Sequence, residues 1–256
     1  MLGWTVVGTD LALLVGAMSL ASFPSFRTKD PSYVDGLWGL GFVLVGVVAC
    51  ALGEGDPGRK ALLVGLSCAW AGRLSAYLFR RWRRTGPDPR YQRLLGPDAS
   101  SALIWAKVFV LQAVLVWVVS LPVQLGQLDA GRLTALNGVG AVLAAAGIVT
   151  EAVADAQLTA FKRDAHNHGM VMDRGLWAWS RHPNYFGESL TWWGIALVAW
   201  HDALTTVGLV GPLVITLFLL TKSGIGPLER QLTATKPAYA DYVARTSAFL
   251  PRRPRG

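Results

Sequence analysis

Residues 175–188 read GLWAWSRHPNYFGE and lead directly into an apolar run, SLTWWGIALVAW, over residues 189–200. The stretch places Arg181, His182, Asn184, Tyr185 and Glu188 at the start of that run. Polar and ionisable groups cost several kcal/mol at a membrane boundary unless they are paired. A polar cluster in this position is therefore expected to be kept for a function.

The rest of the chain consists mainly of long apolar blocks. Its 256 residues are 52% hydrophobic and 16% charged, whereas a soluble domain carries about 25% charged residues. Long apolar blocks favour membrane-spanning helices over a soluble core. We therefore expect an all-α, polytopic membrane protein that forms a single domain over 1–256. Seven blocks are expected to span the membrane, at about 4–23, 36–53, 61–79, 102–125, 133–158, 187–201 and 204–221.

The distribution of positive charge predicts the orientation of these spans. Of the 24 Lys and Arg, Arg73 and Lys107 fall inside spans, and most of the others fall in loops on one side. Only Arg59, Lys60 and Arg132 fall on the other side. The positive-inside rule then places the N-terminus outside and the C-terminus in the cytoplasm, in the inner membrane if the cell is bacterial. This topology accounts for the net charge of +8 without a nucleic-acid partner.

Cysteine and histidine usage indicates neither a disulfide nor a metal site. Cys50 and Cys68 both fall in predicted spans and behave there as small apolar residues. His166 and His168 lack a matching cluster of Cys or carboxylates. The first block has no basic region before it, so we expect a retained helix instead of a signal peptide.

Three segments on the predicted cytoplasmic side, at about 80–100, 151–188 and 222–256, carry most of the polar residues. The first is strongly basic, and it could anchor the chain to anionic headgroups or cover an anionic ligand. In the second, Glu151, Asp155 and Lys162 are spaced so that they share one helix face. These residues could face a wet cavity, or pair with basic side chains such as Arg181.

The helix that enters the membrane after Pro183 is a candidate anion site. Asn184 is placed to cap this helix, and Glu188 follows four residues later on the same side. Free N–H groups at a helix start, flanked by Arg181 and His182, suit a phosphate or a carboxylate.

The tail segment combines aromatic and basic residues. Tyr239, Tyr242 and Arg245 are spaced to share one helix face. Tyr can stack on a purine or nicotinamide ring, and Arg can bind a phosphate with two hydrogen bonds. Anchoring at the membrane surface explains the same pattern equally well.

With these residues in view, the chain resembles the DUF1295 branch of the steroid 5-alpha-reductase family. The motif Ser180 to Glu188, followed by Trp192-Trp193-Gly194, carries the resemblance, which covers most of the chain. The family implies a seven-helix membrane enzyme with NADPH in a cavity open to the cytoplasm. Such an enzyme transfers hydride to an activated carbon–carbon double bond of a lipid-soluble enone.

The resemblance also implies which residues bind the cofactor, and three of these positions depart from the family pattern. The family's Asn, Asp and Arg on the preceding helix correspond to Glu151, Asp155 and Lys162, so only the Asp is kept. The Asn-x-x-Gly-Glu motif matches through Asn184, Gly187 and Glu188. The tail resembles the family's Tyr-x-x-x-Arg…Pro ending through Tyr242, Arg245 and Pro251, with the Arg one position early. The residues thereby expected at the cofactor are Asp155, Lys162, Arg181, His182, Asn184, Tyr185, Glu188, Tyr242 and Arg245.

The resemblance is weaker on the substrate side. Arg73 and Tyr77 match the family, but Trp70 stands at the position of the catalytic Tyr. Asp35 is the nearest counterpart of the family's catalytic Glu. We assign the polarising donor to Tyr77, with Asp35 as its partner and Arg73 as a local charge. Alternatively, Asp35 and Arg73 form an ion pair that joins the second and third spans.

Two other functions remain open. Isoprenylcysteine carboxyl methyltransferases, which use S-adenosylmethionine, carry an Arg-His-Pro-x-Tyr motif matched by Arg181, His182, Pro183 and Tyr185. They have an acid pair near the tail helix, where this chain has only Glu229. The third alternative is a lipid- or sterol-binding membrane protein without enzymatic activity. The lipophilic substrate, expected to enter from the membrane lipids, and the oligomeric state are not predicted by the sequence.

Overall fold

The computed structural model describes residues 2–96, 98–221 and 224–254, so positions 222, 223, 255 and 256 of the predicted tail segment lie outside the described residues. Over the described residues the chain is helical and contains no strand. Six of these helices are long and apolar enough to cross a membrane. The all-α class and an integral membrane protein are thereby confirmed. The six are Gly3–Thr28, Val34–Leu52, Pro57–Thr85, Ser101–Val119, Ala135–Arg163 and Ala203–Leu220.

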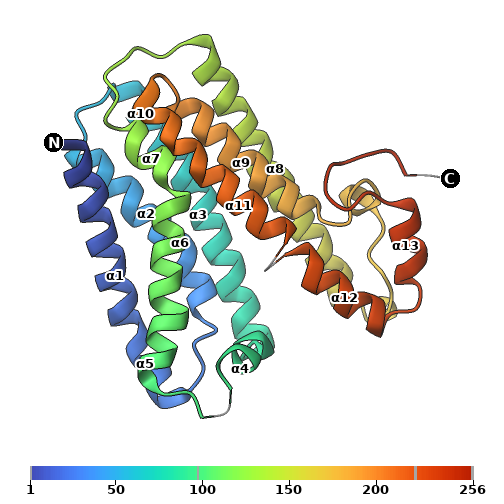
Figure 1. Cartoon of the computed structure of the whole chain (residues 1–256). Helices are drawn as coiled ribbons and strands as arrows, with labels where there is room; N and C mark the ends of the chain where they lie inside the picture. The colour runs from blue at the N-terminus through green and yellow to red at the C-terminus, as the bar shows by residue number, and fades with distance from the viewer. Residues whose placement is uncertain (1, 97, 222–223, 255–256) are drawn as a thin grey trace. The chain divides into compact units, whose positions relative to one another are not determined.

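The sixth predicted span, at about 187–201, is the one missing from these six, and it corresponds to α9 (Pro183–Ala199), which has 17 residues (Figure 1). It starts inside the polar patch, as expected, because Pro183 is tolerated at the first position of a helix. A helix that crosses a bilayer needs about 20 residues, and α9 is shorter. The count of seven spans and the orientation of the termini therefore stay predictions.

The chain divides into two compact units. The first comprises Met1–Gly138 and Ile195–Gly211, and the second comprises Val139–Gly194 and Pro212–Gly256. The expectation of a single domain over 1–256 stays a prediction.

In the first unit, α2 (Val34–Leu52) packs along α3 (Pro57–Thr85) through small residues. A Cβ on Gly39 would lie 2.6 Å from the Ala71 carbonyl oxygen, so the two backbones approach closely at this point. The unit also contains α1 (Leu2–Thr28), α4 (Pro89–Leu95), α5 (Ser101–Ile104), η1 (Trp105–Val110, a π-helix), α6 (Leu111–Val119), α7 (Leu121–Gly126), α10 (Ala203–Thr206) and η4 (Val207–Leu209).

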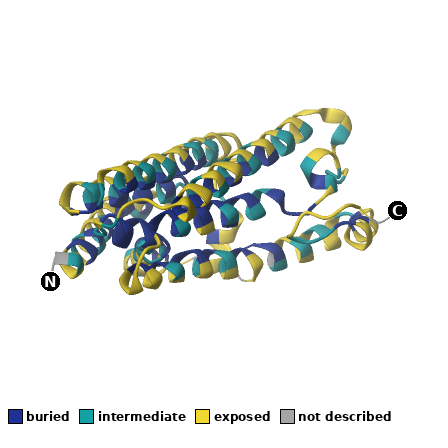
Figure 2. Cartoon of the chain, turned by 90° about the horizontal axis from the view of Figure 1, so that it is seen from above, coloured by how far each residue is buried: buried dark blue, intermediate teal, exposed yellow. Residues whose placement is uncertain are grey.

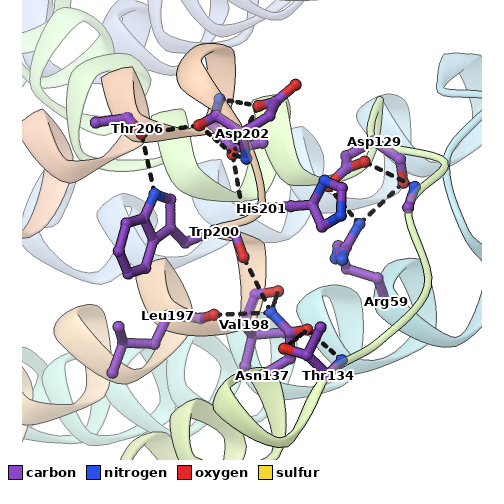
Figure 3. A network of polar contacts seen from close by, with 12 residues as sticks. Arg59, Asp129, Thr134, Asn137, Leu197, Val198, Trp200, His201, Asp202 and Thr206 are labelled. Atoms are coloured by element: carbon purple, nitrogen blue, oxygen red, sulfur yellow. Dashed lines mark hydrogen bonds and ion pairs between the residues drawn. The ribbon is translucent and has the colours of Figure 1, made fainter.

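A polar network in this unit satisfies groups that the helix ends would leave unpaired (Figure 3). The buried Arg59 guanidinium forms an ion pair with Asp129, with 2.6 Å between Nη1 and Oδ2. The His201 ring lies 3.3 Å from the same carboxylate. The Asn137 side-chain amide donates to the carbonyls of Leu197 and Val198 in the last turn of α9, and to that of Trp200, which directly follows the helix. Such carbonyls have no partner within their own helix, so Asn137 supplies one.

The second unit is built on α8 (Ala135–Arg163) and α9, which approach closely at two glycines. A Cβ on Gly147 would lie 2.5 Å from the Thr191 nitrogen, and a Cβ on Gly187 would lie 2.6 Å from the Glu151 nitrogen. The glycine of the Asn-x-x-Gly-Glu motif is thus a packing residue. The unit also contains η2 (Ala165–Asn167), η3 (Gly175–Ala178), α11 (Val210–Leu220), α12 (Ile225–Thr235) and α13 (Tyr239–Arg245).

Many large apolar residues of the long helices are exposed, and Figure 2 shows exposed positions along these helices in yellow. Leu20 of α1 is 72% exposed, and Val142 and Val149 of α8 are 68% and 61% exposed. In water, an apolar surface of this extent would drive aggregation. These faces are therefore consistent with contact to the acyl chains of membrane lipids.

Replacing Gly147 with Ala is expected to destabilise the protein. The added methyl would meet the α9 backbone, which cannot move aside as a flexible side chain can, so a cost of about 1–3 kcal/mol is expected. Gly138→Ala, in the same helix, is the matched control because a Cβ at that position meets nothing within 4 Å. Thermal melting in detergent should show a lower melting temperature for Gly147→Ala and no loss for Gly138→Ala. Equal melting temperatures for the two variants would contradict this account of the α8–α9 contact.

Candidate cofactor site

The centre of the polar patch is an ion pair between Arg181 and Glu229, which brings the residues before α9 to α12. Arg181 Nε donates to Glu229 Oε1 at 2.7 Å, and Nη2 donates to Oε2 at 3.0 Å. Arg181 is 9% exposed, so its charge is largely removed from water. The bidentate geometry compensates the cost of that burial.

His182 binds the same carboxylate. Its Nε2 lies 2.9 Å from Glu229 Oε1, and its ring stacks on that of Tyr185 with 5.4 Å between the centroids. Burial alone would raise the pKa of Glu229, but the hydrogen bonds from His182 and Arg181 outweigh it and lower the pKa to about 2. Glu229 is therefore an ionised acceptor that holds two side chains of the motif in place.

The tail wraps around this cluster through backbone groups. Arg181 Nη1 donates to the carbonyls of Val243 and Thr246, and the Arg181 backbone N–H donates to the Ser247 carbonyl at 2.8 Å. The Arg252 N–H donates to the carbonyl of Trp179 at 2.9 Å. The tail therefore forms part of the site.

Tyr242 connects α13 to η3, the short helix before the polar patch. Its hydroxyl donates to the Trp177 carbonyl at 2.5 Å, and its ring packs edge-on against that of Tyr239. Burial raises the pKa of both phenols, that of Tyr239 to about 12. Both therefore remain protonated donors at neutral pH.

Asn184 and Asp155 meet between α9 and α8. The Asn184 side-chain N–H donates to Asp155 Oδ1 at 3.3 Å. Asn184 is the second residue of α9, so the expectation that it caps the helix is wrong, because the helix begins earlier at Pro183. Its side-chain oxygen is buried and has no hydrogen-bond partner among the described residues. Asn184 therefore offers an acceptor for a ligand donor.

A cavity of about 410 Å³ lies beside the ion pair, between the end of α8, the loop before α9, α12 and α13. Its polar wall is cationic or neutral, and no Asp or Glu lines it in the described part of the chain. The rest of the wall is mainly apolar. Among the residues that line it are Leu158, Lys162, Trp177, Arg181, His182 and Lys236.

Only some of the nine residues predicted to bind the cofactor line the cavity. Arg245 does not reach the cavity wall, because it pairs with Asp173 and is half exposed. Glu188 is a residue of α9, it is buried, and it is not part of the cavity wall. Four of the nine line the cavity, namely Lys162, Arg181, His182 and Tyr242, while Asp155, Asn184 and Tyr185 lie on the helices next to it.

The predicted catalytic residues belong to the first unit, and their contacts differ from those expected. Asp35 accepts from the Tyr91 hydroxyl at 2.5 Å and from Arg90 at 2.9 Å, and it pairs with neither Arg73 nor Tyr77. The alternative of an Asp35–Arg73 ion pair is therefore wrong, because α4 brings closer partners to Asp35. Burial and the charge of Asp35 raise the pKa of Tyr91.

Trp70, at the position of the family's catalytic Tyr, is part of an aromatic core. It is completely buried, and its ring packs edge-on against those of Phe42 and Trp38, at centroid distances of 5.1 and 6.0 Å. Trp70 therefore fills space between α2 and α3.

Three residues of these clusters were not predicted from the sequence: Glu229, Lys236 and Tyr91. Glu229 carried a usable signal, because a single acid in the basic tail is a natural partner for the buried Arg181. Lys236 and Tyr91 carried none, since each depends on how a short helix folds back.

These features define the class of the protein. It is an all-α integral membrane protein with a cavity whose charged lining residues are cationic in the described part of the chain. The chain belongs to the family described as "Protein of unknown function (DUF1295)", whose model matches residues 24–246. No curated protein and no solved structure matches the chain. The matched region contains the ion pair and the cavity, so the resemblance to DUF1295 is confirmed. The link to steroid 5-alpha-reductases stays a prediction.

The Glu229 carboxylate should make the stability of the protein depend on acid pH. Its pKa is about 2 in the folded state against an ordinary value of 4.5. Its contribution is therefore complete above about pH 5 and is lost as the pH falls towards 2. Melting temperatures measured from about pH 6 down to pH 3 should converge for the wild type and Glu229→Gln. Glu54→Gln, which removes an exposed acid, is the control. A gap between wild type and Glu229→Gln that stays constant with pH would contradict this role.

Proposed function

We propose that this protein is a membrane-embedded, NADPH-dependent reductase that transfers hydride to the activated C=C bond of a lipophilic enone. The proposal includes seven spans, with α9 as the sixth, an outside N-terminus and a cytoplasmic C-terminus. The cavity then faces the cytoplasm, where NADPH is dissolved, and the substrate enters from the bilayer. Cytoplasmic groups bind the charged cofactor, and the membrane part accepts the apolar substrate.

The observation that supports this proposal best is the charge of the cavity wall. Lys162, Lys236 and Arg181 line it, and no carboxylate does in the described residues. NADPH is a polyanion, whereas S-adenosylmethionine carries a positively charged sulfonium group. A cationic wall attracts the first and repels the second. Asn184 adds an open hydrogen-bond acceptor on the neighbouring helix.

The reaction also needs a donor at the substrate. Hydride transfer leaves negative charge on the enone oxygen, and a preorganised donor there lowers the barrier. Tyr77 remains the proposed donor, with Arg73 one helical turn away on α3. Asp35 is already engaged by Tyr91 and Arg90, so we no longer assign it as the direct partner of Tyr77.

A methyltransferase is the second candidate, because one observation favours it. Methyltransferases with an Arg-His-Pro-x-Tyr motif carry acids near the tail helix, and here Glu229 of α12 binds both Arg181 and His182. The absence of carboxylates from the described cavity wall argues against a sulfonium ligand in that place.

Thermal melting of the detergent-purified protein with NADPH or S-adenosylmethionine tests the proposal. A ligand at 100 times its Kd stabilises the folded state by about 2.7 kcal/mol, which is a rise of several degrees for a chain of this size. We expect this rise with NADPH and its loss in Asn184→Ala. Asn137→Ala is the matched control: it removes a buried amide elsewhere, so it should lower the ligand-free melting temperature but keep the rise. A rise with S-adenosylmethionine alone would make the protein a methyltransferase.

A further inference from the structure

Lys236 occupies a distinct position in the cavity wall. It follows the last residue of α12, three residues before Tyr239 starts α13. Its ammonium donates to the Met170 carbonyl at 2.5 Å, which connects the tail to the loop before α9. Lys162, in the last turn of α8, lines the same cavity from another element.

No acid among the described residues forms an ion pair with Lys236. Its hydrogen-bond partner in the described structure is a neutral carbonyl. Arg181, by contrast, already forms a bidentate pair with Glu229. The wall therefore has one cation whose charge is used internally, and another, Lys236, whose charge is available to a ligand.

The wall around the lysines suits a flat apolar group. Leu158 and Phe161 precede Lys162 on α8, and Trp177 and Leu232 complete this part of the lining. Apolar and aromatic surfaces of this kind cover the faces of a planar ring, while a few polar groups fix its orientation. A ring that carries an adjacent phosphate meets both requirements.

We infer that Lys236, together with Lys162, binds the phosphomonoester on the adenosine ribose of NADPH and so selects NADPH over NADH. This inference rests on the proposed function. A phosphomonoester carries a charge of about −1.5 to −2 at pH 7, whereas NADH has a neutral hydroxyl at that position. An ammonium therefore discriminates between the two cofactors through this one group, and the rest of the nucleotide contributes equally to both.

Binding of nucleotides to the full-length protein in detergent, measured by calorimetry, tests the inference. The probes are NADPH, NADH, and the fragments adenosine 2′,5′-bisphosphate and 5′-AMP. Lys236→Met removes the charge and keeps a long apolar stem. We expect it to weaken NADPH and the bisphosphate about ten- to a hundredfold and to leave NADH and 5′-AMP unchanged. Lys236→Arg should restore most of the preference.

Lys60→Met is the matched control. The Lys60 ammonium also donates to a backbone carbonyl, that of Gly53, but Lys60 does not line the cavity. It should leave all four affinities unchanged. A ligand-free melting temperature for Lys236→Met near that of the wild type would show that the variant folds.

The outcomes separate this inference from the function on which it rests. If the wild type binds NADPH and NADH equally, or if Lys236→Met keeps the full preference, the inference is wrong and the reductase proposal stands. If the wild type binds neither cofactor, the proposed function fails, and this inference fails with it. If Lys236→Met weakens NADH and NADPH by the same factor, Lys236 maintains the structure of the site and does not select between the two cofactors. That result would overturn the inference.

Discussion

The bidentate ion pair between Arg181 and Glu229 is the interaction on which the second unit depends. A guanidinium that is 9% exposed has lost most of its hydration, and a carboxylate and two carbonyls replace the water that it has lost. Removing one partner of such a pair is far more costly than its net contribution suggests, because the other charge stays buried and unpaired. The pair therefore fixes the position of α12 relative to the start of α9.

The same pair determines the chemistry of the neighbouring groups. An ionised carboxylate can only accept hydrogen bonds, so His182 must carry its proton on Nε2, the atom that faces Glu229. The pair also neutralises the charge of Arg181. In the described residues, Lys236 is by contrast a cation of the cavity wall whose hydrogen-bond partner is a neutral carbonyl. In the proposed function, the polar patch holds the site together, and Lys236 and Lys162 are the residues proposed to recognise the anion.

The sequence was most informative where one physical rule acted alone. Long apolar blocks predicted the helices, and the polar patch predicted the start of α9 to within two residues. The spacing of Glu151, Asp155 and Lys162 placed them correctly on one helix, α8. The sequence was least informative where distant segments meet. Asp35 was expected to lie with Tyr77, but α4 folds back and supplies Tyr91 and Arg90. The partner of a buried charge is set by such a fold-back, and no local period encodes it.

Within the site, too, the sequence did not identify the role of residues whose contacts come from distant segments. Gly187 was read as part of a functional motif, yet it allows the backbones of α9 and α8 to approach. Tyr242 was expected to stack on a ring, yet its hydroxyl is held by the Trp177 carbonyl. In both cases the residue type suited two roles, and only the packing partner distinguishes between them.

The central claim is that the cavity between α8, α12 and α13 binds NADPH. Hydrogen–deuterium exchange of the detergent-purified protein, with and without saturating NADPH, tests this claim most directly. The account predicts slower exchange in the loop around Met170 and in the segment from Lys236 to Tyr242, with little change in α1 and α2. Unchanged exchange in those two segments, or protection there by S-adenosylmethionine alone, would contradict it.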